Sequence, residues 1–110
     1  MKKILILLTL AISFSISAQI STGNTNNSGT YSSAIGYQTT ASESYCTAMG
    51  YATTASGSTS TAMGVSTTAS GDGSTTMGNQ TEASGNNSTA MGANTIASGA
   101  NSAAMGVGTT

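Results

Sequence analysis

Residues 60–71 read STAMGVSTTASG and contain two triplets, Ala-Met-Gly and Ala-Ser-Gly, that differ only in their middle residue. The first triplet ends on a glycine that recurs every 14 residues, at Gly36, Gly50, Gly64, Gly78, Gly92 and Gly106. The second triplet falls half a unit later and ends on Gly57, Gly71, Gly85 and Gly99. The chain is therefore a tandem array of 14-residue units that runs from about Tyr31 to Thr110.

A seven-residue spacing of glycines also invites comparison with a coiled coil. Heptads need large apolar residues at two of seven positions and helix-forming residues elsewhere. This chain instead places glycine in each heptad, at a cost of about 1 kcal/mol each relative to alanine, among many Thr, Ser and Asn residues. The composition therefore excludes a coiled coil over the repeats.

Short Thr/Ser/Ala segments between regularly spaced glycines are typical of strands joined by tight turns. The glycines would lie at corners that need positive φ or a close approach of the backbone. Two strands of about five residues and two turns would make one coil, and successive coils would stack about 4.8 Å apart. We therefore predict an all-β fold, a parallel β-roll or solenoid of 14-residue repeats.

The two halves of each coil are predicted to differ in what they present to the outside. Alternation along a strand puts the alanines of both triplets on the inner face, where they are small enough for a narrow interior. The middle residue of each triplet then points outward, and it is serine on one side and apolar on the other. The apolar column comprises Ile35, Met49, Met63, Met77, Met91 and Met105. Since soluble monomers seldom expose such a stripe, we expect it to be a self-association face.

The repeat resembles the YadA-like head repeat of trimeric autotransporter adhesins. In that family the core reads Ser-x-Ala-Ile-Gly followed by Ala-x-Gly or Ala-Ser-Gly, and residues 32–36, SSAIG, are close to it. The resemblance covers residues 31–110, about five and a half units. It implies a left-handed parallel β-roll, with three chains around one axis, displayed outside the cell. In that arrangement the outward apolar column is the core of the trimer.

The sequence departs from the family pattern in several places. Methionine replaces isoleucine in five of the six units, Thr76 interrupts the alanine column, and Glu43 occupies the place of a glycine. No stalk or anchor segment of that family is recognised, so we expect the repeats to be a truncated, N-terminal part of a longer product. Similar repeats also occur in secreted proteins that resemble phage tail fibres.

The N-terminus has the outline of a secretory signal peptide. Lys2 and Lys3 precede an apolar run, residues 4–16, which is too short to span a bilayer, and the run is followed by a small residue, Ala18. An uncleaved anchor or an amphipathic helix is the alternative. We expect a signal peptide over residues 1–18, a flexible N-terminal lead over residues 19–30 and the head repeats over residues 31–110.

Charged side chains are scarce downstream of Ala18, where Glu43, Asp72 and Glu82 are the only ones, and the chain has no histidine. Nucleic-acid binding is excluded because no Lys or Arg remains to displace phosphate counterions. Acid–base catalysis is not indicated, since the three carboxylates occupy unlike positions of the repeat. We therefore expect no enzymatic activity and no cofactor. We also expect no metal site, because Asp72 is not repeated in every unit as the aspartate of calcium-binding solenoids is.

Tyrosine and cysteine are the remaining candidates for a role beyond structure. Tyr31 and Tyr45 stand 14 residues apart, as do Tyr37 and Tyr51, so the first units carry two short aromatic ladders. The four form either an adhesive patch near the N-terminal tip or a stacked cap on the end of the roll. Cys46 replaces a serine of the repeat, and its alternative role is an interchain disulfide near the trimer axis.

The sequence predicts an interaction protein, a cell-surface or secreted adhesin head. Its partners would be two further copies of itself and an unidentified host, cell or surface ligand, bound through many weak contacts. The expected location is the cell surface, the outer membrane or the medium, with no membrane span in the mature part. A structural spacer of a tail-fibre-like secreted protein is the first alternative.

A second alternative, from another functional class, is an ice-binding solenoid. A regular threonine column suggests it, although adjacent threonines such as Thr53 and Thr54 point to opposite faces. The column comprises Thr39, Thr53, Thr67, Thr81, Thr95 and Thr109.

Export of the chain is open to a direct test. Mass spectrometry of the secreted protein is expected to find a chain that begins at Gln19, because the small-residue site ends at Ala18. Recovery of only an intracellular chain that retains Met1 would contradict this prediction.

Overall fold

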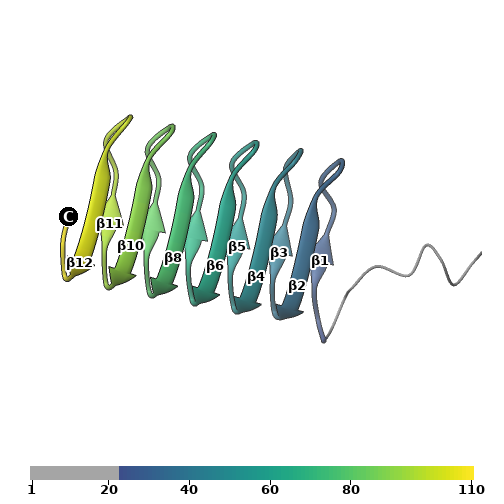
Figure 1. The fold of residues 1–110 in the computed structure, drawn as a ribbon. Coiled ribbons are helices and arrows are strands. Elements are labelled where there is room, and N and C mark those ends of the chain that lie inside the picture. Colours follow the sequence, from purple (N-terminus) through teal and green to yellow (C-terminus); the bar gives the residue numbers. More distant parts are fainter. Residues whose placement is uncertain (1–22) are drawn as a thin grey trace, which may run out of the picture.

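The computed structural model describes residues 23–110, which form a β-solenoid with two six-stranded, parallel sheets (Figure 1). The longer strands are β2 (Ser33–Tyr37), β4 (Thr47–Tyr51), β6 (Thr61–Val65), β8 (Thr75–Asn79), β10 (Thr89–Ala93) and β12 (Ala103–Val107). The shorter strands are β1 (Asn26–Asn27), β3 (Thr40–Ala41), β5 (Thr54–Ala55), β7 (Thr68–Ala69), β9 (Glu82–Ala83) and β11 (Ile96–Ala97). The predicted all-β, parallel roll of 14-residue repeats is confirmed.

The second strand of each coil is shorter than predicted, with two residues where about five were expected. Its end lies where two amides share one acceptor. The N–H groups of Ser56 and Gly57 both donate to the carbonyl of Ala69, at 2.9 and 3.2 Å. Because one carbonyl serves two donors, the chain turns away from the sheet at this point, and the rest of the half-coil is a turn.

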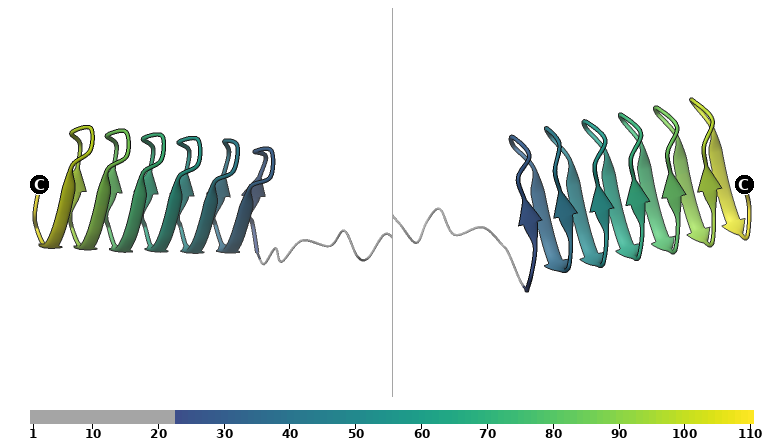
Figure 2. Two further views of the ribbon diagram at one scale, coloured as in Figure 1. Left: turned by 45° about the horizontal axis from the view of Figure 1, so that its top comes forward. Right: turned by 180° about the vertical axis from the view of Figure 1, so that it is seen from behind.

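Each coil stacks on the next in strict register. Met63 pairs with Met77, Gly64 pairs with Gly78, and the same offset of 14 residues holds along the longer sheet. Every position of the repeat therefore becomes a column that runs along the roll. Figure 2 shows this succession of coils from two further sides, with the shorter strands in front in the view from behind.

The interior between the two sheets is narrow and holds only small side chains. The alanines of both triplets are buried there, as predicted: Ala34, Ala48, Ala62, Ala90 and Ala104 from one, and Ala41, Ala55, Ala69, Ala83 and Ala97 from the other. Threonine is the largest side chain that is fully buried in the described part of the chain. Such a core removes little apolar area from water per residue.

Both glycine columns are required by the close approach of neighbouring coils. A Cβ atom on Gly64 would lie 2.0 Å from the carbonyl oxygen of Gly78, and one on Gly71 would lie 2.1 Å from that of Gly85. Gly64 also has a φ of +125°, whereas Gly71 has no positive φ. The prediction that glycines permit close approach is confirmed for both columns, and the prediction of positive φ holds for one.

A different column supplies the left-handed backbone at the corners. From Tyr31 to Gly108 it lies two residues after each glycine position and has φ between 52 and 67°. Its amides donate to the coil before, as Ser66 N does to Tyr51 O at 2.8 Å. Ten of its twelve residues are not glycine: Tyr31, Gln38, Tyr45, Ala52, Thr59, Ser66, Gln80, Asn87, Asn94 and Asn101, with Gly73 and Gly108 completing the column. Glycine therefore does not mark the corner residue itself.

The roll begins before residue 31, where the repeats were expected to start. Strand β1 pairs in parallel with β3, and the amide of Asn26 donates to the carbonyl of Thr39 at 2.8 Å. Gly29 already stacks on the next coil, since a Cβ there would lie 2.0 Å from the carbonyl oxygen of Glu43. The predicted signal peptide and the first residues of the predicted lead lie outside the described residues. Within residues 23–110, no helix has the length and apolarity to cross a membrane.

The glycine columns predict a sharp difference between two neighbouring substitutions. Gly64→Ala should lower the free energy of unfolding by about 3 kcal/mol or more, because its Cβ overlaps a backbone carbonyl of the next coil. Ser66→Gly should be neutral or stabilising by about 1 kcal/mol, since Ser66 already has a left-handed φ of 53°. Urea denaturation of both variants measures the difference. Equal stability of Gly64→Ala and the parent would refute the close approach.

Candidate functional site

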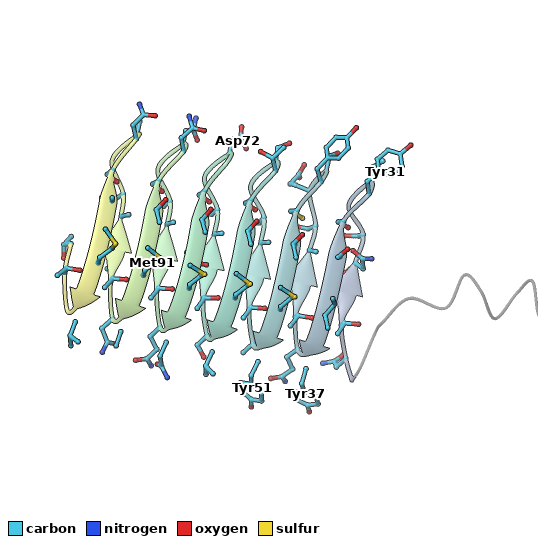
Figure 3. The ribbon with its side chains drawn as sticks, viewed as in Figure 1. Tyr31, Tyr37, Tyr51, Asp72 and Met91 are labelled. Atoms are coloured by element: carbon cyan, nitrogen blue, oxygen red, sulfur yellow. The ribbon has the colours of Figure 1, made fainter. Side chains whose placement is uncertain are left out.

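The outer face of the longer sheet carries an apolar stripe from end to end. Its main column comprises Ile35, Met49, Met63, Met77, Met91 and Met105, which the register places side by side. The side chains are half-buried against one another, and Met105 on the last coil is 60% exposed. Figure 3 shows the sulfur atoms in a row along the roll, with Met91 labelled. The predicted outward direction of this column agrees with the structure.

A second apolar column lies beside the methionines and was not anticipated as part of the stripe. Strand alternation puts the last residue of each longer strand on the same face as the methionine two positions earlier. Tyr37, Tyr51 and Val65 are 50, 51 and 42% exposed there. The sequence contains the pattern that predicts this second column, since an apolar residue follows two positions after the middle residue of the first triplet in these coils. The stripe is therefore two columns wide over the first three coils.

The outer face of the shorter sheet is polar in the first coils. Ser56 is half-buried and Ser70 is exposed, as predicted for the middle residues of the second triplet. Thr54 and Thr68 stand two positions earlier on the same outward face and are half-buried. The roll thus has one apolar and one hydroxyl-bearing face.

The four tyrosines form two separate pairs rather than one patch. Tyr31 and Tyr45 stack with ring centroids 5.5 Å apart, and Tyr37 and Tyr51 stack at 5.6 Å. Tyr31 lies at one edge of the roll, whereas Tyr37 and Tyr51 lie at the opposite edge (Figure 3). The predicted aromatic ladders are present, but one chain does not bring all four rings together.

The regular threonine column lies inside the roll and not on its surface. Thr39, Thr53, Thr67, Thr81 and Thr95 are at most 1% exposed, so they cannot present a flat hydroxyl surface to ice. The physical reason is strand alternation, because each of these threonines lies two residues before an interior alanine. The premise of the ice-binding alternative is therefore wrong.

Cys46 also lies inside the coil rather than at an outer face. Its side chain is fully buried, and its thiol donates to the backbone carbonyl of Glu43 at 2.9 Å. A sulfur atom in this position cannot reach a second chain without unfolding the coil. The interchain disulfide considered above is therefore incompatible with the fold.

The three carboxylates are dispersed over the roll. Asp72 accepts a hydrogen bond from the amide of Ser58 at 2.9 Å, and its own amide donates to Asn86 Oδ1 at 3.2 Å. These contacts tie three successive coils together at one corner. Residues 23–110 contain no group of three or more His, Cys, Asp or Glu side chains that could hold a metal ion.

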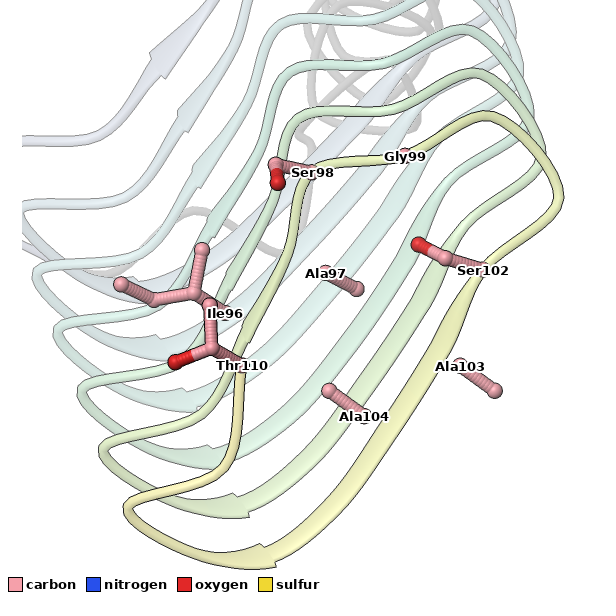
Figure 4. A pocket seen from close by; sticks show the side chains of 8 residues that line it. All are labelled: Ile96, Ala97, Ser98, Gly99, Ser102, Ala103, Ala104 and Thr110. Carbon is pink, nitrogen blue, oxygen red and sulfur yellow. The ribbon is translucent and has the colours of Figure 1, made fainter.

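A cavity at the C-terminal end of the roll is the open end of the coil itself (Figure 4). Its lining contains no titratable side chain and consists of Ile96, Ala97, Ser98, Gly99, Ser102, Ala103, Ala104 and Thr110. Ala97 and Ala104 belong to the interior columns described above. The cavity therefore exposes the core packing of one coil and offers no arrangement for catalysis.

Comparison with known families gives a match that spans the described repeats. The family model described as "YadA head domain repeat (2 copies)" matches residues 28–53, 47–67, 55–81, 69–95 and 83–109. The matches overlap along the chain, which is the behaviour expected of a tandem array. No curated protein matches the chain.

One interior residue breaks the alanine column and predicts a stabilising substitution. Thr76 is fully buried, and its hydroxyl has no hydrogen-bond partner. Thr76→Val should raise the free energy of unfolding by about 1 kcal/mol, because a buried unpaired hydroxyl is removed at almost constant volume. Thr68→Val, at an outward position of the shorter sheet, is the control and should change stability by less than about 0.5 kcal/mol. A loss of stability in Thr76→Val would show that the hydroxyl is bonded in solution.

Proposed function

Because this chain belongs to the YadA head repeat family, we propose that it is the head of a surface-displayed adhesin, in which three copies assemble around one axis. The observation that carries the proposal is the apolar stripe of Ile35 and the five methionines on the outer face of the longer sheet. A head of this family is a structural repeat domain, so adhesion and not catalysis is the activity to expect from it.

The stripe calls for a covering partner on energetic grounds. Ordering a residue costs about 1–2 kcal/mol in backbone entropy. The interior offsets this poorly, since threonine is the largest side chain fully buried in the described residues. Each methionine buried against another chain would contribute about 1.5–3 kcal/mol. A second copy of the same chain is the partner that carries a matching column at the same 14-residue spacing.

The proposed assembly has three chains, each wound as a left-handed roll. The methionine columns face the common axis, and the hydroxyl-bearing face of the shorter sheet faces water. Tyr37 and Tyr51 lie beside the methionine column, so they border the contact with the neighbouring chain. This arrangement would remove the exposed stripe and leave three polar outer faces.

Adhesion would come from repetition of weak contacts and not from one deep site. The roll repeats the same outer columns from coil to coil, and three chains triple the number of equivalent positions. Tethering many weak sites raises the overall affinity through effective concentration. This function requires that the chain is exported and displayed at the cell surface.

The assembly is tested by removing the apolar column from the centre of the stripe. When Met63, Met77 and Met91 are changed together to Ser, the first triplet reads Ala-Ser-Gly in two of these coils and Thr-Ser-Gly in the coil of Thr76. Truncation of a buried methionine costs about 2–5 kcal/mol. The summed cost of three truncations per chain is therefore comparable to the whole free energy of unfolding of a typical domain, about 5–15 kcal/mol. Light scattering and circular dichroism should report trimers for the parent and monomeric or unfolded chains for the variant.

The matched control changes the opposite face of the same coils. Ser56, Ser70 and Ser84 replaced together by Asn should leave the trimer intact, because this face is proposed to meet water. A methionine variant that remains a folded trimer would show that the column is not the interface. Adhesion of cells that display the parent, measured against cells that display the methionine variant, separates an adhesive head from a structural spacer.

A further inference from the structure

One corner of the roll combines two departures from the repeat. It is the turn over residues 43–45, Glu-Ser-Tyr, together with Tyr31 from the coil before. Tyr31 and Tyr45 stack through ring centroids 5.5 Å apart with an interplanar angle of 20°. We call these residues the Tyr31/Tyr45/Glu43 corner.

The two tyrosines occupy backbone positions that disfavour them. Tyr31 and Tyr45 have φ of 56 and 59°, a left-handed conformation that is unfavourable for bulky side chains. The next coil has Thr59 there, and the three coils after it have residues that tolerate this conformation better, Gly73, Asn87 and Asn101. The rings gain little from burial in return, because Tyr31 is 79% and Tyr45 is 61% exposed. Strained, exposed aromatic residues of this kind are a reason to look for a ligand.

Glu43 is the second departure in the same turn. It occupies the column of Gly29, Gly57 and Gly71, which is one of the two columns where coils approach closely, and it is exposed. Glu43 also lies two residues before Tyr45, so a carboxylate and a stacked aromatic pair share one corner. This is the only one of the described corners at which a carboxylate and tyrosines coincide.

The other tyrosine pair has a structural explanation. The ring of Tyr37 covers Gly23, since a Cβ on Gly23 would lie 2.7 Å from Tyr37 Cδ2. Tyr37 and Tyr51 also border the apolar stripe. These two rings therefore cap the first coil and extend the proposed interface, whereas Tyr31 and Tyr45 lie at the opposite edge (Figure 3).

We infer that the Tyr31/Tyr45/Glu43 corner binds an arginine side chain of a partner protein. A guanidinium group stacks on an aromatic ring and donates hydrogen bonds to a carboxylate at the same time, which matches the two chemistries of this corner. A quaternary ammonium group could stack on the rings but could not donate to Glu43. The inference rests on the proposed adhesive function and names the chemical class of its ligand.

The charge of the roll favours a basic protein over other surfaces. Residues 23–110 contain three carboxylates and no Lys or Arg, so anionic membranes and nucleic acids are repelled. A basic protein surface is attracted, and three chains would present three such corners. Arginine is preferred to lysine because its planar group both stacks and forms paired hydrogen bonds.

The test measures binding of the purified protein to an immobilised Gly-Arg repeat peptide, with a Gly-Lys repeat peptide and phosphatidylcholine vesicles as further arms. The parent should bind the arginine peptide at least about threefold more tightly than the lysine peptide and should not bind the vesicles. Glu43→Gln should weaken arginine binding by about two- to fivefold, and Tyr31→Asn with Tyr45→Asn by about five- to thirtyfold. Asparagine already occupies this column at Asn87 and Asn101, so the double variant should melt no lower than the parent.

Matched controls separate this site from general charge and from assembly. Glu82→Gln removes an equal charge elsewhere and should not change arginine binding. Equal losses from Glu43→Gln and Glu82→Gln, unchanged binding by the Tyr31 and Tyr45 variant, or equal binding of the vesicles would overturn the inference. Light scattering of every variant keeps the outcomes apart, because a trimeric, adhesive parent that ignores arginine contradicts only this inference.

Discussion

The approach of neighbouring coils at the two glycine columns is the constraint on which the structure depends. At Gly64 and Gly71 there is no room for a Cβ atom, because a backbone carbonyl of the next coil lies 2.0 or 2.1 Å from where it would be. This approach lets corner amides, such as that of Ser66, bond to the coil before. Because both halves of the coil are held in this way, each coil contains 14 residues and the register between neighbouring strands cannot slip. All columns of like side chains follow from that fixed pitch.

A fixed pitch turns each position of a short repeat into a continuous surface. A single methionine per coil would be unremarkable on a globular protein, but here five of them and Ile35 become one stripe. The same geometry limits the interior to residues no larger than threonine, so the single roll has little apolar area to bury. A roll with a small apolar core and a continuous apolar outer face gains free energy when that face is covered by another chain. Both features follow from the sequence of the repeat.

Much of this architecture could be predicted from the sequence, because its strongest signals are steric. Glycine spacing identified the close approaches, and alternation correctly placed the alanines inside and the methionines outside. The left-handed corners were missed because Ser66, Gln80 and Tyr45 carry no compositional mark of positive φ. The ice-binding alternative required the threonine column to lie on the surface, whereas Thr53 lies two residues before the interior Ala55 and is itself buried. Threonine is a polar residue that usually lies at the surface, but strand alternation places this column inside the roll. The cost is visible in the described part of the chain, where ten buried hydroxyls lack a hydrogen-bond partner.

In a solenoid, the residues that repeat are explained by stacking, and those that do not repeat need another explanation. Thr76 breaks the alanine column inside the roll, where it can affect only stability. Glu43 and the Tyr31–Tyr45 pair break their columns on the outside, at positions where backbone geometry favours smaller residues. Later coils have glycine at the position of Glu43, and at the position of the tyrosines they have Thr59, Gly73, Asn87 and Asn101. The exceptions to the repeat at this corner are therefore the residues at which we propose recognition, on a roll whose repeating residues specify its shape.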